Sequence, residues 1–277
     1  MKYKNIIVSI IFFLSSIIIF VGCNRLENRI SKIINKNQVI AHAGGGFDGL
    51  TYLNIEESIH EHYNNGTRIF EYDFALSSDD ELIGIHYWES HLVGDGYSFN
   101  NRMTLEEYEK TLIAGEYTGI TFINLLNLMK TDFLDIVIII DTKESNIEFF
   151  YEKIVSDIKS VDENLISRII PQLYNEEMYN LLENIQPFQY YVYTLYKTDA
   201  SNQEVYEFLL EHEKIVILTV SSYRVQSMSE DYIKTIHELN RRVFVHTVND
   251  HEAIIDLIEK GVDGIYTDFV YENTKIE

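Results

Sequence analysis

The chain has 277 residues, of which 46% are hydrophobic and 13% aromatic, so it can build a substantial core and does not have the composition of a disordered protein. Its 44 acidic residues against 22 basic ones give a formal net charge of −22. This charge argues against nucleic acid or a polyanionic lipid surface as the main partner, because the long-range field repels them. A small anionic substrate remains compatible with it if a local cation, such as a metal ion, receives the substrate.

The N-terminal segment has the pattern of an export signal. Lys2 and Lys4 precede an almost wholly apolar run from Ile6 to Gly22, and Cys23, the only cysteine, follows at once. A charged start, an apolar run and a small residue are typical of a secretory signal, and a lone cysteine at the junction resembles the lipidation site of a bacterial lipoprotein. An uncleaved anchor is the alternative, because about 18 apolar residues can span a bilayer. Both interpretations predict an exported domain that is tethered to the outer face of the bacterial cell membrane.

The segment after the cysteine is polar, with apolar residues at helical spacing, and predicts a tether that runs into a short amphipathic helix. The chain as a whole has two prolines and 13 glycines, which leaves no composition for a flexible linker between domains. We therefore expect residues 1–22 to be a signal peptide or membrane anchor, residues 23–37 the tether and short helix, and residues 38–277 one large domain.

The stretch from Arg68 to Trp88 carries the clearest chemical signal. It begins as an alternating strand that places Glu71 and Asp73 on the same face. Two neighbouring carboxylates in a half-buried strand repel each other, so we expect a positive charge between them. Carboxylate oxygens suit hard cations, which predicts a site for Mg²⁺ or Ca²⁺. A turn and a second apolar run then lead to His86.

Strands and helices alternate along the rest of the domain. The run DIVIIIDTK, from Asp135 to Lys143, is typical of a parallel strand that is buried on both faces. The expected strands cover residues 39–43, 68–76, 135–143, 168–174, 189–196, 214–221, 242–248 and 262–267. The expected helices include residues 54–64, 122–130, 146–160, 176–184, 202–212, 230–240 and 251–260, and a further helix opens with a capping box from Thr104 to Glu107.

Eight strands that alternate with helices predict a (β/α)8 TIM barrel. The alternative is an open doubly wound sheet, but no GxGxxG turn follows the first strand. Only Phe269 to Glu277 follow the last strand and its Asp268, so we expect the eighth helix to be incomplete.

The active site of a TIM barrel lies at the carboxyl ends of its strands, so catalytic residue types should gather there. Polar and titratable side chains indeed stand at or just beyond these ends: His42, Glu71, Asp73, His86, Asp141, Lys143, Gln172, Tyr174, Tyr193, Tyr196, Ser221, Tyr223, His246, Asn249 and Asp268. Three acids, two histidines and a lysine therefore converge on one mouth. A purely structural ion pair between Lys143 and Asp141 is the alternative reading for that lysine.

The order of these motifs resembles the glycerophosphodiester phosphodiesterases. The resemblance covers about Val39 to Asp268 and rests on these motifs: His42-Ala-Gly, Glu71-Tyr-Asp73, His86, Asp141-Thr-Lys143, Thr247-Val-Asn249 and the run from Gly261 to Asp268. The chain departs from the family pattern at four places. Ala43 stands where the family has arginine, Tyr52-Leu53-Asn54-Ile55 replaces Pro-Glu-Asn-Thr, Asp141 replaces a glutamate, and Tyr87 replaces a frequent aspartate. The resemblance identifies a divergent member.

The resemblance implies a TIM barrel of the phospholipase C-like phosphodiesterase type and assigns roles to the site residues. Glu71, Asp73 and Asp141 would hold one Mg²⁺ or Ca²⁺, and His42 and His86 would act as acid and base. The residues expected to bind the substrate are Lys143, Gln172, Tyr174 and His246. The substrate would be a small glycerophosphodiester, or a glycerol-phosphate group on a surface polymer, and the products would be glycerol phosphate and an alcohol.

Three other functions stay open at this point. A related branch cleaves lysolipids in the manner of a phospholipase D and shares the two histidines and the metal acids. A glycoside hydrolase would need two facing carboxylates, for which Glu71 and Asp141 are candidates, but it would give His42, His86 and Lys143 no role. A tethered binding lipoprotein without catalytic activity is the non-enzymatic alternative, suggested by the loss of the family arginine at Ala43.

Overall fold

The computed structural model describes residues 29–88 and 90–274 and divides into two units, residues 1–36 and 37–277. In the first unit, residues 29–36 are helical. The predicted signal or anchor over residues 1–22 and the predicted lipidation site at Cys23 lie outside the described residues. Within the described residues, no helix has both the length and the apolar character that crossing a membrane requires.

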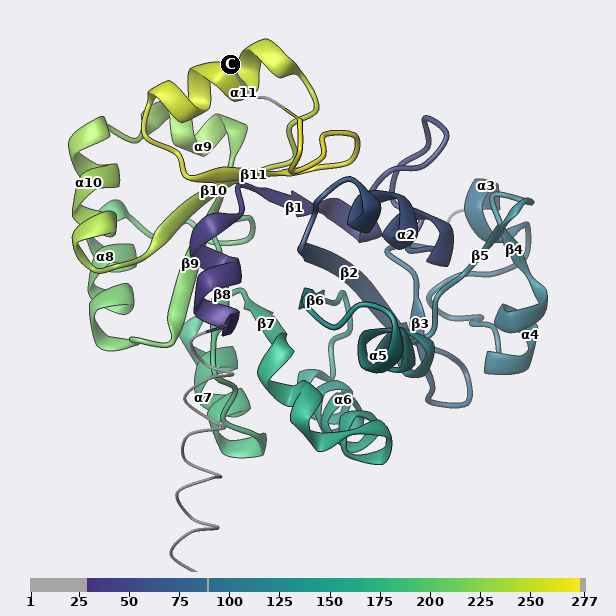
Figure 1. Ribbon diagram of the computed structural model, residues 1–277. Coiled ribbons are helices and arrows are strands. Elements are labelled where there is room, and N and C mark those ends of the chain that lie inside the picture. Colours follow the sequence, from purple (N-terminus) through teal and green to yellow (C-terminus); the bar gives the residue numbers. More distant parts are fainter. Residues whose placement is uncertain (1–28, 89, 275–277) are drawn as a thin grey trace, which may run out of the picture. The chain divides into compact units, whose positions relative to one another are not determined.

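The second unit is built on a closed ring of eight parallel strands (Figure 1). Their bounds are β1 Val39–Ala41, β2 Ile69–Leu76, β6 Val137–Asp141, β7 Ile169–Leu173, β8 Tyr191–Thr194, β9 Ile215–Ser221, β10 Arg242–His246 and β11 Gly264–Thr267. Each strand pairs in parallel with its neighbours, and β1 closes the ring because it pairs with both β11 and β2. The predicted TIM barrel is therefore confirmed, and the open doubly wound sheet is excluded.

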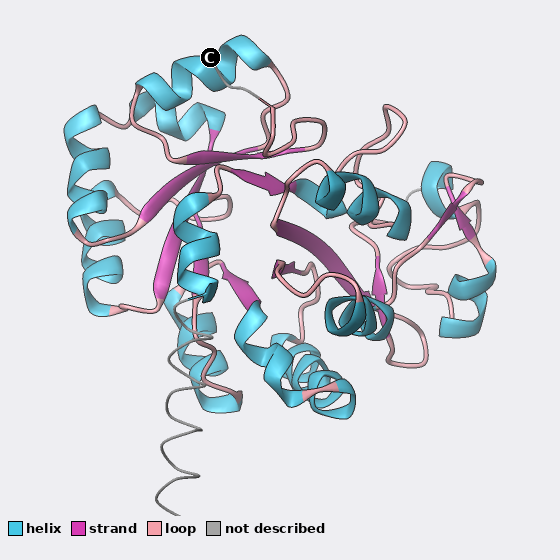
Figure 2. Ribbon diagram, in the orientation of Figure 1, coloured by secondary structure: helices cyan, strands magenta, loops and turns pink. Residues whose placement is uncertain are grey.

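The helices lie outside the strands (Figure 2). Their bounds are α2 Glu56–Asn64, α5 Phe122–Thr131, α6 Ile147–Val161, α7 Glu176–Ile185, α8 Asn202–Glu211, α9 Ser222–Ser227, α10 Glu230–Glu238 and α11 His251–Glu259. Asn146 caps the N-terminus of α6 and Asn175 that of α7, through side-chain oxygens that accept from backbone N–H groups. No helix follows β11 in residues 268–274, in line with the expected incomplete eighth helix.

Alternation along β2 decides which side chains enter the barrel. Phe70, Tyr72 and Phe74 point outward into the main core cluster, where Phe74 packs against Phe122 of α5 with ring centroids 5.2 Å apart. The intervening odd-numbered positions therefore face the barrel interior. The sequence predicted a half-buried strand, but all eight residues of β2 are buried, because a barrel strand is covered on both faces.

An insertion between β2 and α5 forms a separate lobe at one side of the barrel (Figure 1). It contains β3 Leu82–Gly84, α3 Ser90–Val93, α4 Leu105–Lys110, β4 Leu112–Ile113 and β5 Tyr117–Thr118. The strand β3 is antiparallel to β2, and the lobe has its own small apolar cluster. The capping box predicted at Thr104 is confirmed and starts α4.

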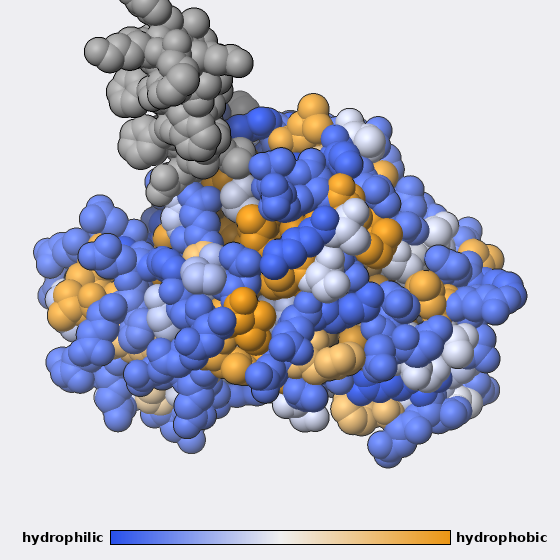
Figure 3. Space-filling view, turned by 90° about the horizontal axis from the view of Figure 1, so that it is seen from below, coloured by the Kyte–Doolittle hydropathy of each residue, from blue (hydrophilic) through white to orange (hydrophobic). Residues whose placement is uncertain are grey.

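The molecular surface in Figure 3 is predominantly hydrophilic, with smaller groups of hydrophobic residues near the middle of that face. This distribution fits a chain in which 24% of the residues are charged and many of the apolar residues are buried in the barrel core.

Candidate active site

A cavity of about 240 Å³ opens at the carboxyl ends of the strands and gathers the predicted site. All nine side chains predicted to be catalytic, metal-binding or substrate-binding line it: His42, Glu71, Asp73, His86, Asp141, Lys143, Gln172, Tyr174 and His246. They come from β2, β6, β7 and β10 and from the segments that directly follow β1, β3, β6 and β7. The barrel thus brings together residues as distant in sequence as His42 and His246, as the strand-end argument predicted.

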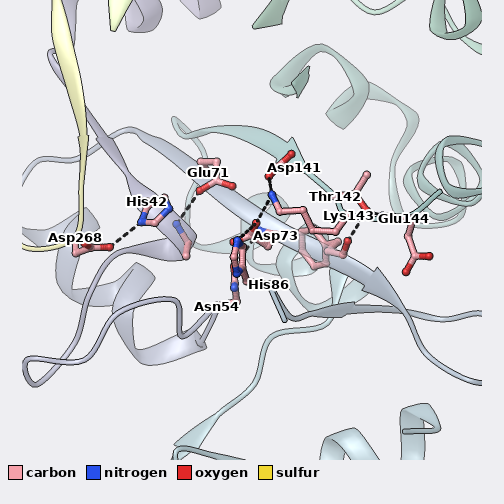
Figure 4. Close-up of polar contacts among 12 residues, drawn as sticks. His42, Asn54, Glu71, Asp73, His86, Asp141, Thr142, Lys143, Glu144 and Asp268 are labelled. Atoms are coloured by element: carbon pink, nitrogen blue, oxygen red, sulfur yellow. Dashed lines mark hydrogen bonds and ion pairs between the residues drawn. The ribbon is translucent and has the colours of Figure 1, made fainter. Parts of the chain in front are cut away.

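Three buried carboxylates form the centre of the cavity (Figure 4). Glu71 and Asp73 lie on the interior face of β2, and Asp141 ends β6, where the strand register places it opposite Asp73. One oxygen of each carboxylate lies within 4.8 Å of the other two. Burial together with the neighbouring carboxylates raises the pKa of Glu71 to about 8 and that of Asp73 to about 6.

These carboxylates fit a hard divalent cation. The donor set consists only of carboxylate oxygens, and Oδ2 of Asp73 is buried without a hydrogen-bond partner among the described residues. A buried acceptor that lacks a partner calls for an explanation, and burial beside other carboxylates makes the charged forms of Glu71 and Asp73 unfavourable without an added cation. A cation held by Glu71, Asp73 and Asp141 would meet both requirements.

Lys143 and Tyr174 both contact the third carboxylate. The ammonium of Lys143 donates to Oδ2 of Asp141, and its Nζ lies 3.8 Å from Oδ1 of Asp73. The hydroxyl of Tyr174 donates to Oδ1 of Asp141. Burial alone would raise the pKa of Asp141, but the lysine charge and these hydrogen bonds lower it overall. The ion pair considered from the sequence therefore exists, and it also holds a positive charge inside the cavity.

His42 is held by a chain of hydrogen bonds from residues that follow β10 and β11. Its Nδ1 lies 2.8 Å from Oδ1 of Asp268, and Nδ2 of Asn249 donates to the other oxygen of Asp268 over 2.7 Å. Burial lowers the pKa of His42, but the hydrogen bond to Asp268 and the charge of Glu71 outweigh it and raise that pKa to about 9. Because Nδ1 is engaged with Asp268, Nε2 is the nitrogen left for proton exchange.

The segment after His42 adopts backbone conformations that the sequence only partly predicted. Ala43, which stands at the position of the family arginine, has a φ of 48° and donates its N–H to Oε2 of Glu71 over 2.8 Å. Its backbone therefore orients a carboxylate of the cluster. Gly45 has a φ of 96°, and a Cβ there would lie 2.3 Å from Nε2 of His62, so glycine is required for both reasons.

Asn54 is a functional neighbour that the sequence placed in the wrong element. The predicted helix from Asn54 begins at Glu56 instead, because Asn54 has a φ of 49°, outside the helical region. Its side chain is buried, and its Oδ1 accepts a hydrogen bond from the N–H of Asp73 over 3.0 Å. This hydrogen bond thus holds the backbone of β2 in place beside the carboxylate cluster. The neighbouring Leu53, which stands in place of a family glutamate, is buried in the small apolar cluster.

The second predicted histidine faces the first across a tyrosine. His86 follows β3, and its Nε2 lies 4.0 Å from Oδ1 of Asp73. The ring of Tyr52 lies between the two histidines, with its centroid 4.7 Å from that of His42 and 4.7 Å from that of His86. No sequence signal singled out Tyr52 from the 20 tyrosines of the chain. Its φ of 59°, unusual for a bulky residue, marks it as a position that the site holds in place.

The opposite wall of the cavity is uncharged. It is formed by Gln172, Thr194, Thr219, His246 and Tyr266. Burial, followed by repulsion from protonated His42, lowers the pKa of His246 to about 4. Within the described part of the chain, His246 Nε2 and Thr219 Oγ1 are buried without hydrogen-bond partners. These neutral polar atoms can receive hydroxyl groups of a substrate.

Comparison with known proteins places this geometry in context. A family model described as the glycerophosphoryl diester phosphodiesterase family matches residues 54–272. No curated protein matches the chain.

Solved structures with the same fold match a larger share of the chain. A glycerophosphoryl diester phosphodiesterase structure from Silicibacter pomeroyi is 15% identical, with a TM-score of 0.72, and the match covers 90% of this chain and 96% of that one. A phosphodiesterase from Oleispira antarctica, solved with the product sn-glycerol-3-phosphate, is 19% identical, with a TM-score of 0.67 and coverage of 84% and 93%. A glycerophosphodiester phosphodiesterase from Thermotoga maritima is 19% identical, with a TM-score of 0.64 and coverage of 84% and 94%.

Proposed function

Because the chain belongs to the glycerophosphoryl diester phosphodiesterase family, and is therefore a phosphoric diester hydrolase, we propose that it cleaves a glycerophosphodiester with a bound divalent cation and two histidines. The observation that carries this proposal is the convergence of the carboxylate cluster, both histidines and Lys143 on one cavity. Family membership decides against the glycoside hydrolase and against the non-catalytic binding protein. The products would be glycerol phosphate and an alcohol.

The carboxylates Glu71, Asp73 and Asp141 would hold the cation, Mg²⁺ or Ca²⁺. When bound, such an ion neutralises the charge of the phosphate and polarises its oxygens. Lys143, on the rim of the same cluster, adds a positive charge beside the phosphoryl group. Ala43 and Asn54 hold the carboxylates in place through their hydrogen bonds to Glu71 and to the backbone of Asp73.

The two histidines would move the protons. Asp268 engages Nδ1 of His42, which leaves the proton on Nε2 for transfer, and a pKa of about 9 keeps that proton on the ring at neutral pH. His42 is therefore assigned as the acid that protonates the leaving alkoxide. His86, on the other side of the Tyr52 ring, is assigned as the base that deprotonates the attacking oxygen.

The uncharged wall would recognise the glycerol moiety. Gln172 and His246 offer neutral hydrogen-bonding atoms to its hydroxyl groups, and Tyr174 lines the cavity between this wall and the carboxylates. A buried group that bonds a substrate hydroxyl discriminates against analogues without that hydroxyl, because the group would then be left unpaired. The wall therefore supports selection of a polyol ester over a simple dialkyl phosphate.

The test is turnover by the full chain, purified in detergent and stripped of metal. Release of glycerol phosphate or of free alcohol is followed for a panel of glycerophosphodiesters and lysolipids, with Mg²⁺, Ca²⁺ or Mn²⁺ added back and His42→Ala as the control variant. Turnover that needs both the ion and His42 would support the mechanism, and the preferred substrate separates it from the phospholipase D-like alternative. Absence of turnover on every ester, in a folded protein that binds no metal, would refute it.

We also propose that the enzyme is exported and tethered to the outer face of the bacterial cell membrane. The support is the sequence pattern of residues 1–23, with a lipid on Cys23 as the first alternative and an uncleaved anchor as the second. Incorporation of labelled fatty acid into the wild-type chain, and its loss in Cys23→Ser, would establish the lipoprotein. A chain that stays in the membrane without incorporating the label would establish the anchor.

A further inference from the structure

A second hollow of about 460 Å³ adjoins the catalytic cavity, and we refer to it as the accessory groove. It lies between the segment from β6 into α6 and the segment from β7 into α7, and Lys197 also lines it. Lys143 and Tyr174 line both the groove and the catalytic cavity, so the two hollows share a wall. An ester arm attached to a phosphate beside Lys143 therefore has the groove as its neighbouring space.

The shared wall is held by contacts on both sides. The hydroxyl of Tyr174 is bound to Asp141 in the catalytic cavity, and Nζ of Lys197 lies 4.7 Å from the centroid of the Tyr174 ring on the groove side. Two contacts hold the ring in one orientation, so the boundary between the hollows is a pre-formed surface. An ester arm that leaves the phosphate in this direction passes the edge of the Tyr174 ring and the methylene chain of Lys197.

Three apolar side chains line the groove near the starts of α6 and α7, among polar neighbours. Ile147 belongs to the first turn of α6, Met178 to the first turn of α7, and Leu181 to its second turn. Met178 is buried and Ile147 is packed against the main core cluster, so the walls are continuous with the barrel packing. Burial of an alkyl group against these side chains is favourable in proportion to the apolar area it removes from water.

The charges around the groove are of both signs. Glu148 and Glu177 line it and repel a second phosphate, whereas Lys197 repels a quaternary ammonium group. Glu144, another groove residue, is already paired with Arg102 over 2.6 Å. Charges of both signs remain, so neither an anionic nor a cationic arm is clearly favoured, and an uncharged arm avoids both repulsions.

We propose that the accessory groove is a subsite for an uncharged, apolar ester arm, so that the preferred substrate is a phosphodiester in which glycerol phosphate is joined to an alkyl alcohol. This inference rests on the proposed function and names its substrate class. The glycerol phosphate would occupy the catalytic cavity against the uncharged wall, and the alkyl arm would pass the ring of Tyr174 into the groove.

The experiment measures kcat/KM for a series of sn-glycerol 3-phosphate alkyl esters, from methyl to octyl, with the metal-loaded full chain. We expect kcat/KM to rise by about threefold for each methylene that enters the groove and then to level off. In Leu181→Asn the increase in kcat/KM per methylene should be less than half that of the wild type, while kcat/KM for the methyl ester is unchanged. Leu210→Asn is the matched control, because Leu210 is exposed on α8 and does not line the groove.

The outcomes separate the groove from the reaction. A flat series with normal turnover of the methyl ester would overturn the groove proposal and leave the proposed function standing. The same holds if glycerophosphocholine outperforms every alkyl ester, because the arm would then be cationic. Failure to hydrolyse any ester would overturn both. An inhibition assay supports the groove without relying on turnover of a diester. Hexyl phosphate should inhibit more strongly than methyl phosphate, and its inhibition should weaken in Leu181→Asn but not in Leu210→Asn.

Discussion

The two halves of the barrel mouth are built from the same strand-and-helix unit but carry opposite electrostatics. The half formed by β1, β2, β6 and β11 holds three carboxylates, Lys143 and the pair of His42 with Asp268. The half formed by β7 to β10 lines the catalytic cavity with neutral polar groups. Two histidines show the contrast most clearly, because the pKa of His42 is raised to about 9 and that of His246 is lowered to about 4.

Neighbours rather than depth cause this difference. Both histidines are largely buried, and burial alone lowers the pKa of each. His42 recovers its charge because Asp268 bonds it directly and Glu71 lies nearby, whereas His246 faces the positive charges of His42 and Lys143 with only Asp141 to offset them. One half of the mouth is thus suited to charge and proton transfer, and the other to recognition of uncharged hydroxyls.

The most severe change to the charged half is the loss of one cluster carboxylate. We expect Asp73→Asn to lower kcat/KM by about ten-thousandfold, since loss of the bound ion removes several kcal/mol of transition-state stabilisation. The same variant should raise the melting temperature of the metal-free protein at pH 7, because it removes a buried charge whose pKa is raised. Calorimetric Ca²⁺ and Mg²⁺ titrations and thermal unfolding measure the two effects. A variant that binds the ion as before would contradict the assignment.

Removal of a catalytic histidine should have the next largest effect. His42→Ala and His86→Ala are each expected to lower kcat by about a thousandfold, within the range for loss of a general acid or base. The measurement is steady-state kinetics at saturating substrate, with calorimetry to show that both variants still bind the cation. If either variant kept more than a tenth of the wild-type kcat, its role in proton transfer would be wrong.

Loss of Asp268, the partner of His42, should lower kcat less than loss of the histidine and should change the pKa of His42. Asp268→Asn is expected to lower kcat about a hundredfold, at the low end of the range for a general acid, because the ring stays but loses its orienting carboxylate. Nuclear magnetic resonance of the metal-free protein should show the pKa of His42 falling from about 9 towards the ordinary histidine value. A pKa that is higher in the folded state than in the unfolded state stabilises the protein below the unfolded pKa, and this stability is lost as pH rises.

The stability difference between wild type and Asp268→Asn should therefore be fully present below about pH 6.5, the ordinary histidine pKa, and decline as the pH rises to about 9. Urea unfolding at pH 6 and pH 9 measures it, and the titration of His246 should be unchanged. A difference that is equal at the two pH values would show that Asp268 acts on the fold rather than on the charge of His42.

The sequence predicted the charged half more completely than the uncharged half. A TIM barrel, the alternation of β2 and the strand end at Asp141 suffice to bring the three acids together, because strand periodicity is regular and carboxylates are rare inside barrels. Gln172 and His246 also followed from strand ends. The sequence could not show that their wall is neutral, since the pKa of His246 depends on neighbours from other strands.

Loop conformations account for most of what the sequence missed. Tyr52 and Asn54 both have a positive φ and reach the site through an irregular segment, where no periodic pattern exists to predict direction. Asp268 and Asn249 were placed at the mouth, but their bond to each other and to His42 depends on the contact between β1 and β11. The first and last strands of the barrel meet only after closure, so this pairing is a property of the fold.

The smallest expected effect tests the uncharged half directly. His246→Gln keeps a neutral hydrogen-bonding side chain of similar reach but displaces the ring from Tyr266 and Tyr196, against which it packs at centroid distances of 6.3 Å and 5.9 Å. A residue that binds the glycerol moiety equally in the ground and transition states affects KM alone. We therefore expect KM to rise about fivefold while kcat stays unchanged, and a glycerol analogue without its secondary hydroxyl to lose this sensitivity. A fall in kcat with unchanged KM would instead place His246 among the proton-transfer groups and remove the division between the two halves.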